Sequence, residues 1–146
     1  MGSMETIAHW VDYSADDIPS EREFVALYDR VQWRAYTRDS ARLAAALAAS
    51  LAVVTARLDG RLVGLARVVG DGLTIVYLQD ILVVPDLQRT GIGRELLRRV
   101  LAPYQDVRQK VLITDDEPRQ RAFYESMGFT EIRDIEHPLR VYVSLS

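Results

Sequence analysis

The segment at residues 73–102 constrains the fold of this 146-residue chain more than any other. Residues 73–84 are rich in β-branched and aliphatic side chains and predict a long strand, which Pro85 ends. A helix is expected from Gly91 to Ala102, because its apolar residues recur at helical spacing on one face. The order of strand, short loop and glycine-started helix predicts an α/β protein.

The other expected elements follow from hydrophobic period and turn signals. Before the long strand we expect a strand at 5–11, helices beginning at Ser20 and Asp39, and strands at 51–57 and 61–69. After the helix at 91–102 we expect an apolar strand at 111–113 buried on both faces, a helix from Pro118 to Met127, and strands at about 130–135 and 139–145. The order β-αα-βββ-α-β-α-β predicts an antiparallel meander followed by α/β units.

The composition is that of an ordinary globular protein and excludes several functions. Apolar residues make up 49% and charged residues 27%, and the net charge of −3 argues against nucleic-acid binding. The absence of Cys excludes thiolate nucleophiles, and the only histidines, His9 and His137, leave little for a metal site, so no metal is expected.

The sequence shows neither a long apolar run nor a linker. Because no stretch approaches 18 apolar residues, no membrane span is expected, and we expect a cytoplasmic protein. Residues 1–3 resemble an expression remnant before Met4, so a single domain over 4–146 is predicted.

The loop between the long strand and the helix has the features of an anion site. The start of a helix leaves about four backbone N–H groups without partners, and the helix dipole makes this end positive. Gly91 and Gly93 would let a bulky anion approach those groups closely. A glycine-started helix with no ligand is the alternative for this pattern alone.

Two other phosphate-binding motifs fit less well. A dinucleotide-binding G-x-G-x-x-G needs a third glycine where this chain has Leu96, and its tight turn follows the strand directly. A Walker A loop needs Gly-Lys-Ser/Thr, which is missing here.

Two motifs together resemble the GCN5-related N-acetyltransferase (GNAT) superfamily. The run Gln88-Arg89-Thr90-Gly91-Ile92-Gly93 resembles its acetyl-CoA motif, Q/R-x-x-G-x-G/A. The run Phe123-Tyr124-Glu125-Ser126-Met127-Gly128-Phe129 resembles its second signature, F-Y-E-x-x-G-F, about 33 residues further on. The resemblance implies a mixed, mostly antiparallel sheet flanked by helices, with two splayed central strands.

The resemblance also implies where acetyl-CoA binds. The pantetheine arm would lie along Ile81, Leu82 and Val83 at the splayed strand, in the manner of an added strand. The pyrophosphate-binding residues would be Gln88, Arg89, Thr90, Gly91, Ile92, Gly93 and Arg94. The side chains of Arg89 and Arg94 could reach phosphate or could simply be solvated.

Tyr124 matches the family tyrosine that faces the coenzyme sulfur, and it could donate a hydrogen bond to the departing thiolate. Asp80 is the candidate base for the acceptor amine, although it could be merely solvated. Strand alternation predicts that Gln79 and Asp80 lie on opposite faces.

The acceptor pocket is expected to contain Tyr36, Tyr77 and Gln79. The activity implied is direct acetyl transfer from acetyl-CoA to an amine, with a small molecule favoured over a protein tail as acceptor. A homodimer is a further expectation. The main alternative is a CoA-binding module without turnover, and a nicotinamide-dependent oxidoreductase is the weaker one.

Overall fold

The computed structural model describes residues 10–146. The chain divides into two compact units, up to Leu112 and from Ile113 to Ser146, and each is described by itself. The prediction of a single domain stays a prediction. The strand predicted at 5–11 lies mostly outside the described residues, and the first described strand begins only at Val11.

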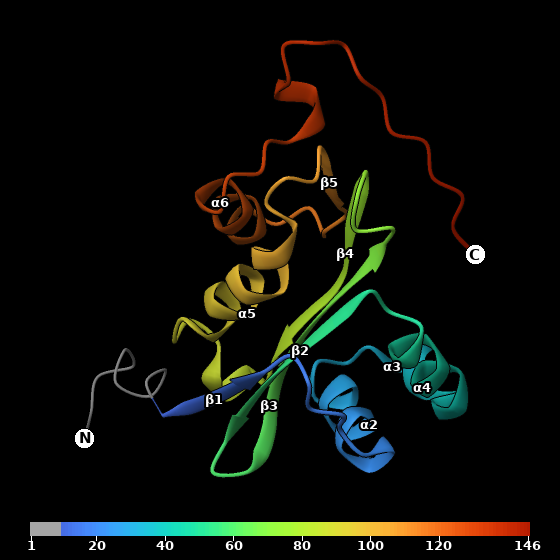
Figure 1. The fold of residues 1–146 in the computed structure, drawn as a ribbon, viewed down its shortest axis with the longest axis vertical. Coiled ribbons are helices and arrows are strands. Elements are labelled where there is room, and N and C mark those ends of the chain that lie inside the picture. The colour runs from blue at the N-terminus through green and yellow to red at the C-terminus, as the bar shows by residue number, and fades with distance from the viewer. Residues whose placement is uncertain (1–9) are drawn as a thin grey trace. The chain divides into compact units, whose positions relative to one another are not determined.

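The first unit contains a five-stranded sheet in the order β1-β2-β3-β4-β5 (Figure 1). Its strands are β1 (Val11–Ser14), β2 (Ala52–Leu58), β3 (Arg61–Gly70), β4 (Ile75–Val83) and β5 (Gln109–Leu112). The pairs from β1 to β4 are antiparallel, whereas β5 lies parallel to β4. The predicted mixed, mostly antiparallel sheet is confirmed.

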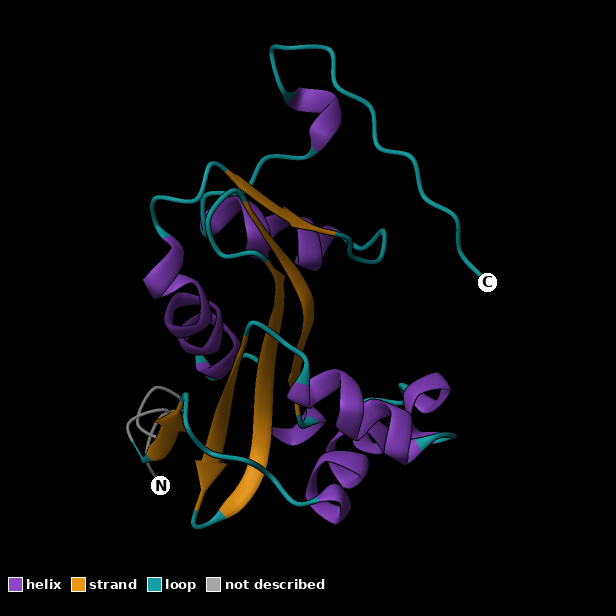
Figure 2. Ribbon diagram, turned by 45° about the vertical axis from the view of Figure 1, so that its right-hand side comes forward, coloured by secondary structure: helices purple, strands orange, loops and turns teal. Residues whose placement is uncertain are grey.

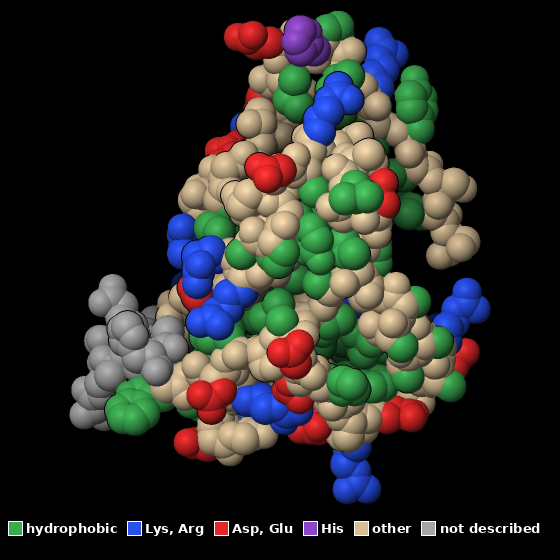
Figure 3. Space-filling view, in the orientation of Figure 1, with side chains coloured by type: hydrophobic (Ala, Val, Ile, Leu, Met, Phe, Trp, Pro, Cys, Tyr) green, Lys and Arg blue, Asp and Glu red, His purple; other side chains and the backbone are tan. Residues whose placement is uncertain are grey.

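Helices cover both sides of this sheet. Three of them lie on one side: α2 (Glu21–Arg30), α3 (Arg34–Thr37) and α4 (Ser40–Ala48). On the other side lies α5 (Ile92–Leu101), as both ribbon views show (Figures 1 and 2). Short 3-10 turns at Pro85–Leu87 and Ala102–Tyr104 flank α5. On the surface seen in Figure 3, hydrophobic side chains gather between α5 and the α3–α4 pair.

The core lies where α5 packs against β3. The side chains of Ile92, Leu96 and Leu97 are at most 1% exposed. A Cβ at Gly64 of β3 would lie 3.0 Å from Leu96 Cδ1, so glycine at this position lets the helix pack closely on the strand. Residues 62–68 of β3 are all buried, because helices cover both faces of this strand.

The prediction of a fully buried strand at 111–113 is wrong. Within the described sheet β5 is an edge strand, its residues Val111 and Leu112 are only half-buried, and Ile113 is 54% exposed. An apolar run of this length does not by itself reveal how many neighbours a strand has. The strand with both faces covered is β3.

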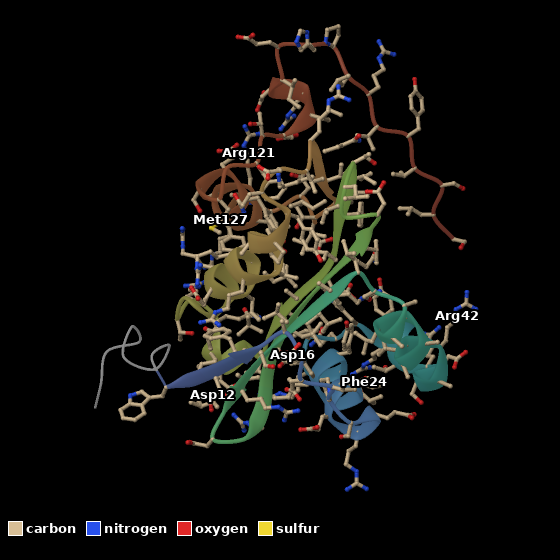
Figure 4. All side chains as sticks on the ribbon, in the orientation of Figure 1. Asp12, Asp16, Phe24, Arg42, Arg121 and Met127 are labelled. Carbon is tan, nitrogen blue, oxygen red and sulfur yellow. The ribbon has the colours of Figure 1, made fainter. Side chains whose placement is uncertain are left out.

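The second unit contains α6 (Pro118–Ser126) and a 3-10 turn at Ile132–Asp134. Figure 4 marks Arg121 of α6, which forms ion pairs with Glu125, Glu131 and Asp134 and so ties the turn to the helix.

The strands predicted at 130–135 and 139–145 are wrong for this structure, since neither segment forms a strand. An alternating pattern gives a strand one apolar face. The backbone N–H and C=O groups of that strand must also form hydrogen bonds with the edge of a neighbouring strand. No such pairing is present for these residues in the described structure, and Tyr142 and Leu145 are 85% and 84% exposed.

The predicted start of a helix at Ser20 is confirmed, and Ser20 forms a capping box there. Ser20 Oγ accepts from the N–H of Glu23, whose carboxylate accepts from the N–H of Ser20. The same carboxylate accepts from Arg57 of β2, at 2.5 Å from Nη1. These bonds, that from Arg57 foremost, lower the pKa of Glu23 from 4.5 to about 2.

We predict that Glu23 contributes to the acid sensitivity of folding. A carboxyl group whose pKa is lower in the folded state contributes stability above its unfolded pKa and loses it as pH falls through the folded pKa. For Glu23 this window runs from about 4.5 down to about 2. Urea unfolding of Glu23→Gln should show a shallower loss of stability across this window than the parent protein. Equal slopes would contradict the assignment.

Candidate functional site

The loop between β4 and α5 is shaped by two residues in the left-handed region. Arg89 has φ +65° and Gly91, the N-cap of α5, has φ +94°. The loop is anchored from within, because Leu87 and Thr90 are buried and Thr90 Oγ1 donates to the carbonyl of Leu87 at 2.6 Å. Arg89 and Gly91 themselves are exposed.

The N-terminus of α5 is open to an anion. No side chain caps it, because Gly91 at the N-cap has none. The first N–H groups of a helix lack intrahelical acceptors and lie at the positive end of its dipole. Left-handed residues alternating with right-handed ones also bring successive N–H groups together into an anion-binding concavity. Among the predicted loop residues, Ile92 is buried in the core, and Gly93 is half-buried.

Gln88, Arg89 and Arg94 are all exposed. Gln88 Nε2 donates to the carbonyl of Val83 at 3.1 Å, so this side chain folds back onto the end of β4.

The outer edge of β4 is paired for only part of its length. Its parallel pairing with β5 runs from Ile75 to Leu78, where β5 ends at Leu112. Beyond Leu78, β4 continues to Val83 with β3 on one edge and no strand partner on the other within the described sheet. This loss of pairing fits the splayed strands that the family resemblance implies.

Alternation along β4 decides which amides face the free edge. The N–H of Val84 donates to Val63 of β3 at 2.9 Å. Because successive residues of a strand direct their backbone groups to opposite edges, Leu82 also faces β3, whereas Ile81 and Val83 face away from it. Of the three residues predicted along the coenzyme arm, two therefore present their backbone and the third, Leu82, does not.

A bulge in β4 corrects the prediction for Gln79 and Asp80. Arg67 of β3 is opposite Asp80 and Val68 is opposite Leu78, so Gln79 is an additional residue in β4. Such a residue interrupts the alternation of side chains. The predicted placement of Gln79 and Asp80 on opposite faces is therefore wrong, because both contact the helical layer of α2 and α3.

The acceptor-side residues predicted from sequence lie together. Gln79 Nε2 donates to Tyr36 Oη at 3.1 Å, and the Tyr36 ring lies 5.8 Å from that of Tyr28 and 6.1 Å from that of Trp33. Tyr77 is half-buried, and burial first, then the neighbouring Tyr36 and Asp80, raises the pKa of its phenol. All these aromatic residues belong to the first unit.

Asp80 is enclosed and ion-paired. Its side chain is 1% exposed, and its Oδ2 accepts from Tyr28 Oη at 2.9 Å and from Arg67 Nε and Nη2 at 2.8 Å each. Its Oδ1 is buried with no hydrogen-bond partner in the described structure. Burial and then the charge of Asp80 raise the pKa of Tyr28, which therefore stays a donor.

Neither Tyr28 nor Arg67 is among the site residues predicted from sequence. The position of Tyr28 at the helical spacing of the apolar residues of α2 predicts packing and no further role. A signal for Arg67 is present in the sequence, because it is the one charged residue in the apolar run 62–69, and the following strand at 73–84 contains a single acid, Asp80. Pairing two such isolated opposite charges across a hairpin would have identified the cluster.

The second unit contains Tyr124, which is buried on α6. Its ring packs against Phe123 at 5.0 Å and Phe129 at 6.1 Å between centroids. Gly128, with φ +93°, ends the helix, and the N–H of Phe129 then donates to the carbonyl of Tyr124. Burial raises the pKa of Tyr124 to about 12, so the phenol is protonated at neutral pH.

The described residues form neither a metal site nor a membrane-spanning helix. Within residues 10–146, no three His, Asp or Glu side chains are grouped so that they could hold a metal ion. No helix in this part of the chain is both long and apolar enough to cross a membrane.

Comparisons with known proteins agree with the two motifs. Residues 12–137 match the model of the acetyltransferase (GNAT) domain family. Serotonin N-acetyltransferase 2, chloroplastic, of Oryza sativa subsp. japonica is 32% identical over 85 residues, which are 58% of this chain and 42% of the rice protein. The chain thus matches less than half the length of that relative.

Solved structures show the same fold. The GNAT family acetyltransferase SP0256 from Streptococcus pneumoniae TIGR4 is 29% identical and has a TM-score of 0.79, over 93% of this chain and 99% of that one. AAC(6')-Iy, in complex with a bisubstrate analog, shares the fold at a TM-score of 0.70 and 18% identity, over 93% and 97% of the two chains. The chain belongs to the GCN5-related N-acetyltransferase superfamily.

Proposed function

We propose that this protein transfers an acetyl group from acetyl-CoA to the amine of a small molecule, by direct attack within a ternary complex. The observation that supports this most is the partnerless edge of β4 beyond Leu78, followed directly by the uncapped start of α5. The first feature suits an extended amide-bearing arm, and the second suits a pyrophosphate. Acetyl-CoA has both parts in this order.

The arm would bond to the backbone of Ile81 and Val83. Leu82 would not bond to the arm, but its backbone bonds to β3 and holds this part of β4 in place. The pyrophosphate would be held by N–H groups from the loop and the first turn of α5. The dipole of a helix contributes about 0.3–2 kcal/mol to such binding, whereas each hydrogen bond to a charged oxygen contributes roughly 1.5–3 kcal/mol. Several amides together would therefore supply most of the affinity, with Arg89 and Arg94 as additional charges.

The acceptor would lie against Tyr36, Tyr77 and Gln79. An amine of pKa ~10.4 must lose a proton at neutral pH, at a cost of about 4–5 kcal/mol. Because Asp80 is sealed in the described structure, it would act as base only through a water molecule that reaches Oδ1. The aromatic surroundings suit a small amine better than a protein tail. One sequence relative is named a serotonin N-acetyltransferase, and one structural neighbour is named an aminoglycoside acetyltransferase.

Tyr124 would donate a hydrogen bond to the thiolate that leaves when the tetrahedral intermediate collapses. With the pKa of Tyr124 at about 12, complete proton transfer to a thiolate of pKa ~8.5 would be uphill by roughly 5 kcal/mol. Tyr124 is therefore proposed to stabilise developing charge rather than to protonate it fully. The homodimer and the cytoplasmic location stay predictions.

The proposed activity is tested by release of free CoA thiol with serotonin, tryptamine, spermidine and the aminoglycoside sisomicin as acceptors. We expect thiol release that depends on at least one amine. Binding of acetyl-CoA without thiol release on any of them would favour the alternative of a CoA-binding module. Absence of acetyl-CoA binding would contradict both.

We predict that Tyr124→Phe lowers kcat at least about tenfold, because a donor to developing charge is lost. Binding of acetyl-CoA, measured by calorimetry, should stay near the parent value, since the ring still packs against Phe123 and Phe129. Tyr142→Phe is the control, because Tyr142 is 85% exposed. A Tyr124→Phe protein as fast as the parent would remove this phenol from the mechanism.

We predict that Gly91→Glu weakens acetyl-CoA binding at least about tenfold, because it introduces bulk and negative charge where the pyrophosphate would bind. Gly60→Glu is the matched control: Gly60 also has positive φ, at +80°, and its Cβ would meet nothing within 4 Å. Both variants place a side chain at a positive φ and add one negative charge, but only the first should lose affinity. Equal affinities would place the pyrophosphate elsewhere.

A further inference from the structure

The proposed reaction gives no task to Arg67 or Tyr28, although both are buried with Asp80. Arg67 is 5% exposed and Asp80 1%, and their ion pair joins β3 to β4 across directly opposite positions. Tyr28 adds a third donor to the same carboxylate oxygen from α2. This cluster lies immediately beside the bulge at Gln79.

A buried ion pair contributes little net stability, because removing both charges from water offsets most of their attraction. Its best-attested role is to select one register among several. Because this pair lies beside a bulge, the register that it affects is that between β3 and β4.

Two registers between β3 and β4 would lack a bulge, and each of them would bury a polar side chain of β4 on an apolar face. If the pairing of Gly64 with Val83 continued regularly, Gln79 would lie opposite Val68, whose side chain is fully buried. If the pairing of Val68 with Leu78 continued regularly, Asp80 would lie opposite Ala66.

Ala66 shares a face of β3 with Gly64, which α5 covers through Ile92 and Leu96. In that second register an unpaired carboxylate would therefore face an apolar helix. The bulged register keeps Asp80 opposite Arg67 and bonded to Tyr28, which the second register does not, and it also keeps Gln79 from lying opposite Val68, which the first register does not.

The bulge also coincides with the end of the pairing between β4 and β5. That pairing stops at Leu78, and Gln79 is the additional residue. Bulges bend a strand, increase its twist and end its pairing with a neighbour. The edge of β4 therefore becomes free at the residue before the bulge.

We propose that the Arg67–Asp80 ion pair, held by Tyr28, fixes the bulge of β4 and thereby sets the place at which the coenzyme arm meets the strand. Arg67 and Tyr28 are then positioning residues. This inference rests on the proposed function for the arm itself. The register is a property of the free protein and is measurable without the coenzyme.

The test is a double variant, Arg67→Met with Asp80→Leu, which removes both charges and keeps apolar volume. We expect a Tm within about 5 °C of the parent, because neutral replacement of a buried pair is tolerated. We expect acetyl-CoA to bind at least about tenfold more weakly by calorimetry, and amide hydrogen exchange to accelerate at residues 79–83. If Asp80 acted only as a base, its replacement would change neither acetyl-CoA binding nor amide exchange at residues 79–83.

The matched control is Arg57→Met with Asp17→Leu. This pair also lies beside a bulge, between Ala56 and Arg57 of β2, with 2.6 Å between Arg57 Nε and Asp17 Oδ2. It should leave acetyl-CoA binding and the exchange of residues 79–83 unchanged. Parent-like binding and exchange in the Arg67/Asp80 variant would overturn the proposal, and so would equal losses in both double variants.

If the Arg67/Asp80 variant does not fold, Tyr28→Phe decides the question. It removes one hydroxyl from the cluster and should still accelerate exchange at 79–83 and weaken acetyl-CoA binding. Tyr13→Phe is its control, since the buried Tyr13 hydroxyl has no hydrogen-bond partner in the described structure. A Tyr28→Phe protein equal to Tyr13→Phe in both readouts would overturn the proposal.

A parent protein that does not bind acetyl-CoA would instead contradict the proposed function. The exchange comparison would then decide the register alone: faster exchange at 79–83 in Tyr28→Phe would support it, and parent-like exchange would overturn it.

Discussion

The hydrogen-bonding capacity of one strand edge organises the first unit. Up to Leu78 the outer edge of β4 is satisfied by β5, and beyond it the strand continues with that edge unpaired in the described sheet. Backbone N–H and C=O groups require partners, so such an edge either meets water or receives another extended chain. A coenzyme arm with amide groups is a partner of this kind, and the uncapped start of α5 at Gly91, the proposed pyrophosphate site, follows along the chain.

The two faces of the sheet at β3 and β4 differ in polarity. Toward α5 the sheet is apolar and closely packed, as Gly64 against Leu96 illustrates. Toward α2 and α3 it bears Gln79 and Asp80, with phenols and an arginine around them. Because the bulge places two consecutive polar side chains toward this layer, the polar cluster is concentrated there without disturbing the apolar core.

Local signals predicted much of this arrangement. The helix start at Ser20, the stop at Pro85 and the helix started by glycine depend on a few neighbouring residues, and each is found where the sequence indicates. The tail at 139–145 has an equally good strand pattern, yet forms no strand here. A helix satisfies its own backbone, whereas a strand depends on an edge that is supplied from elsewhere in the chain or in another molecule.

The sequence by itself determined the family, the order of most elements and the loop that would hold a pyrophosphate, because these depend on short motifs and on hydrophobic period. The tertiary structure alone decided that Gln79 and Asp80 lie toward one helical layer, that Arg67 and Tyr28 enclose the carboxylate, and that Ile81 and Val83 present their amides. Each of these depends on the register between strands that are distant in sequence. One additional residue changes that register without any signature in the local pattern.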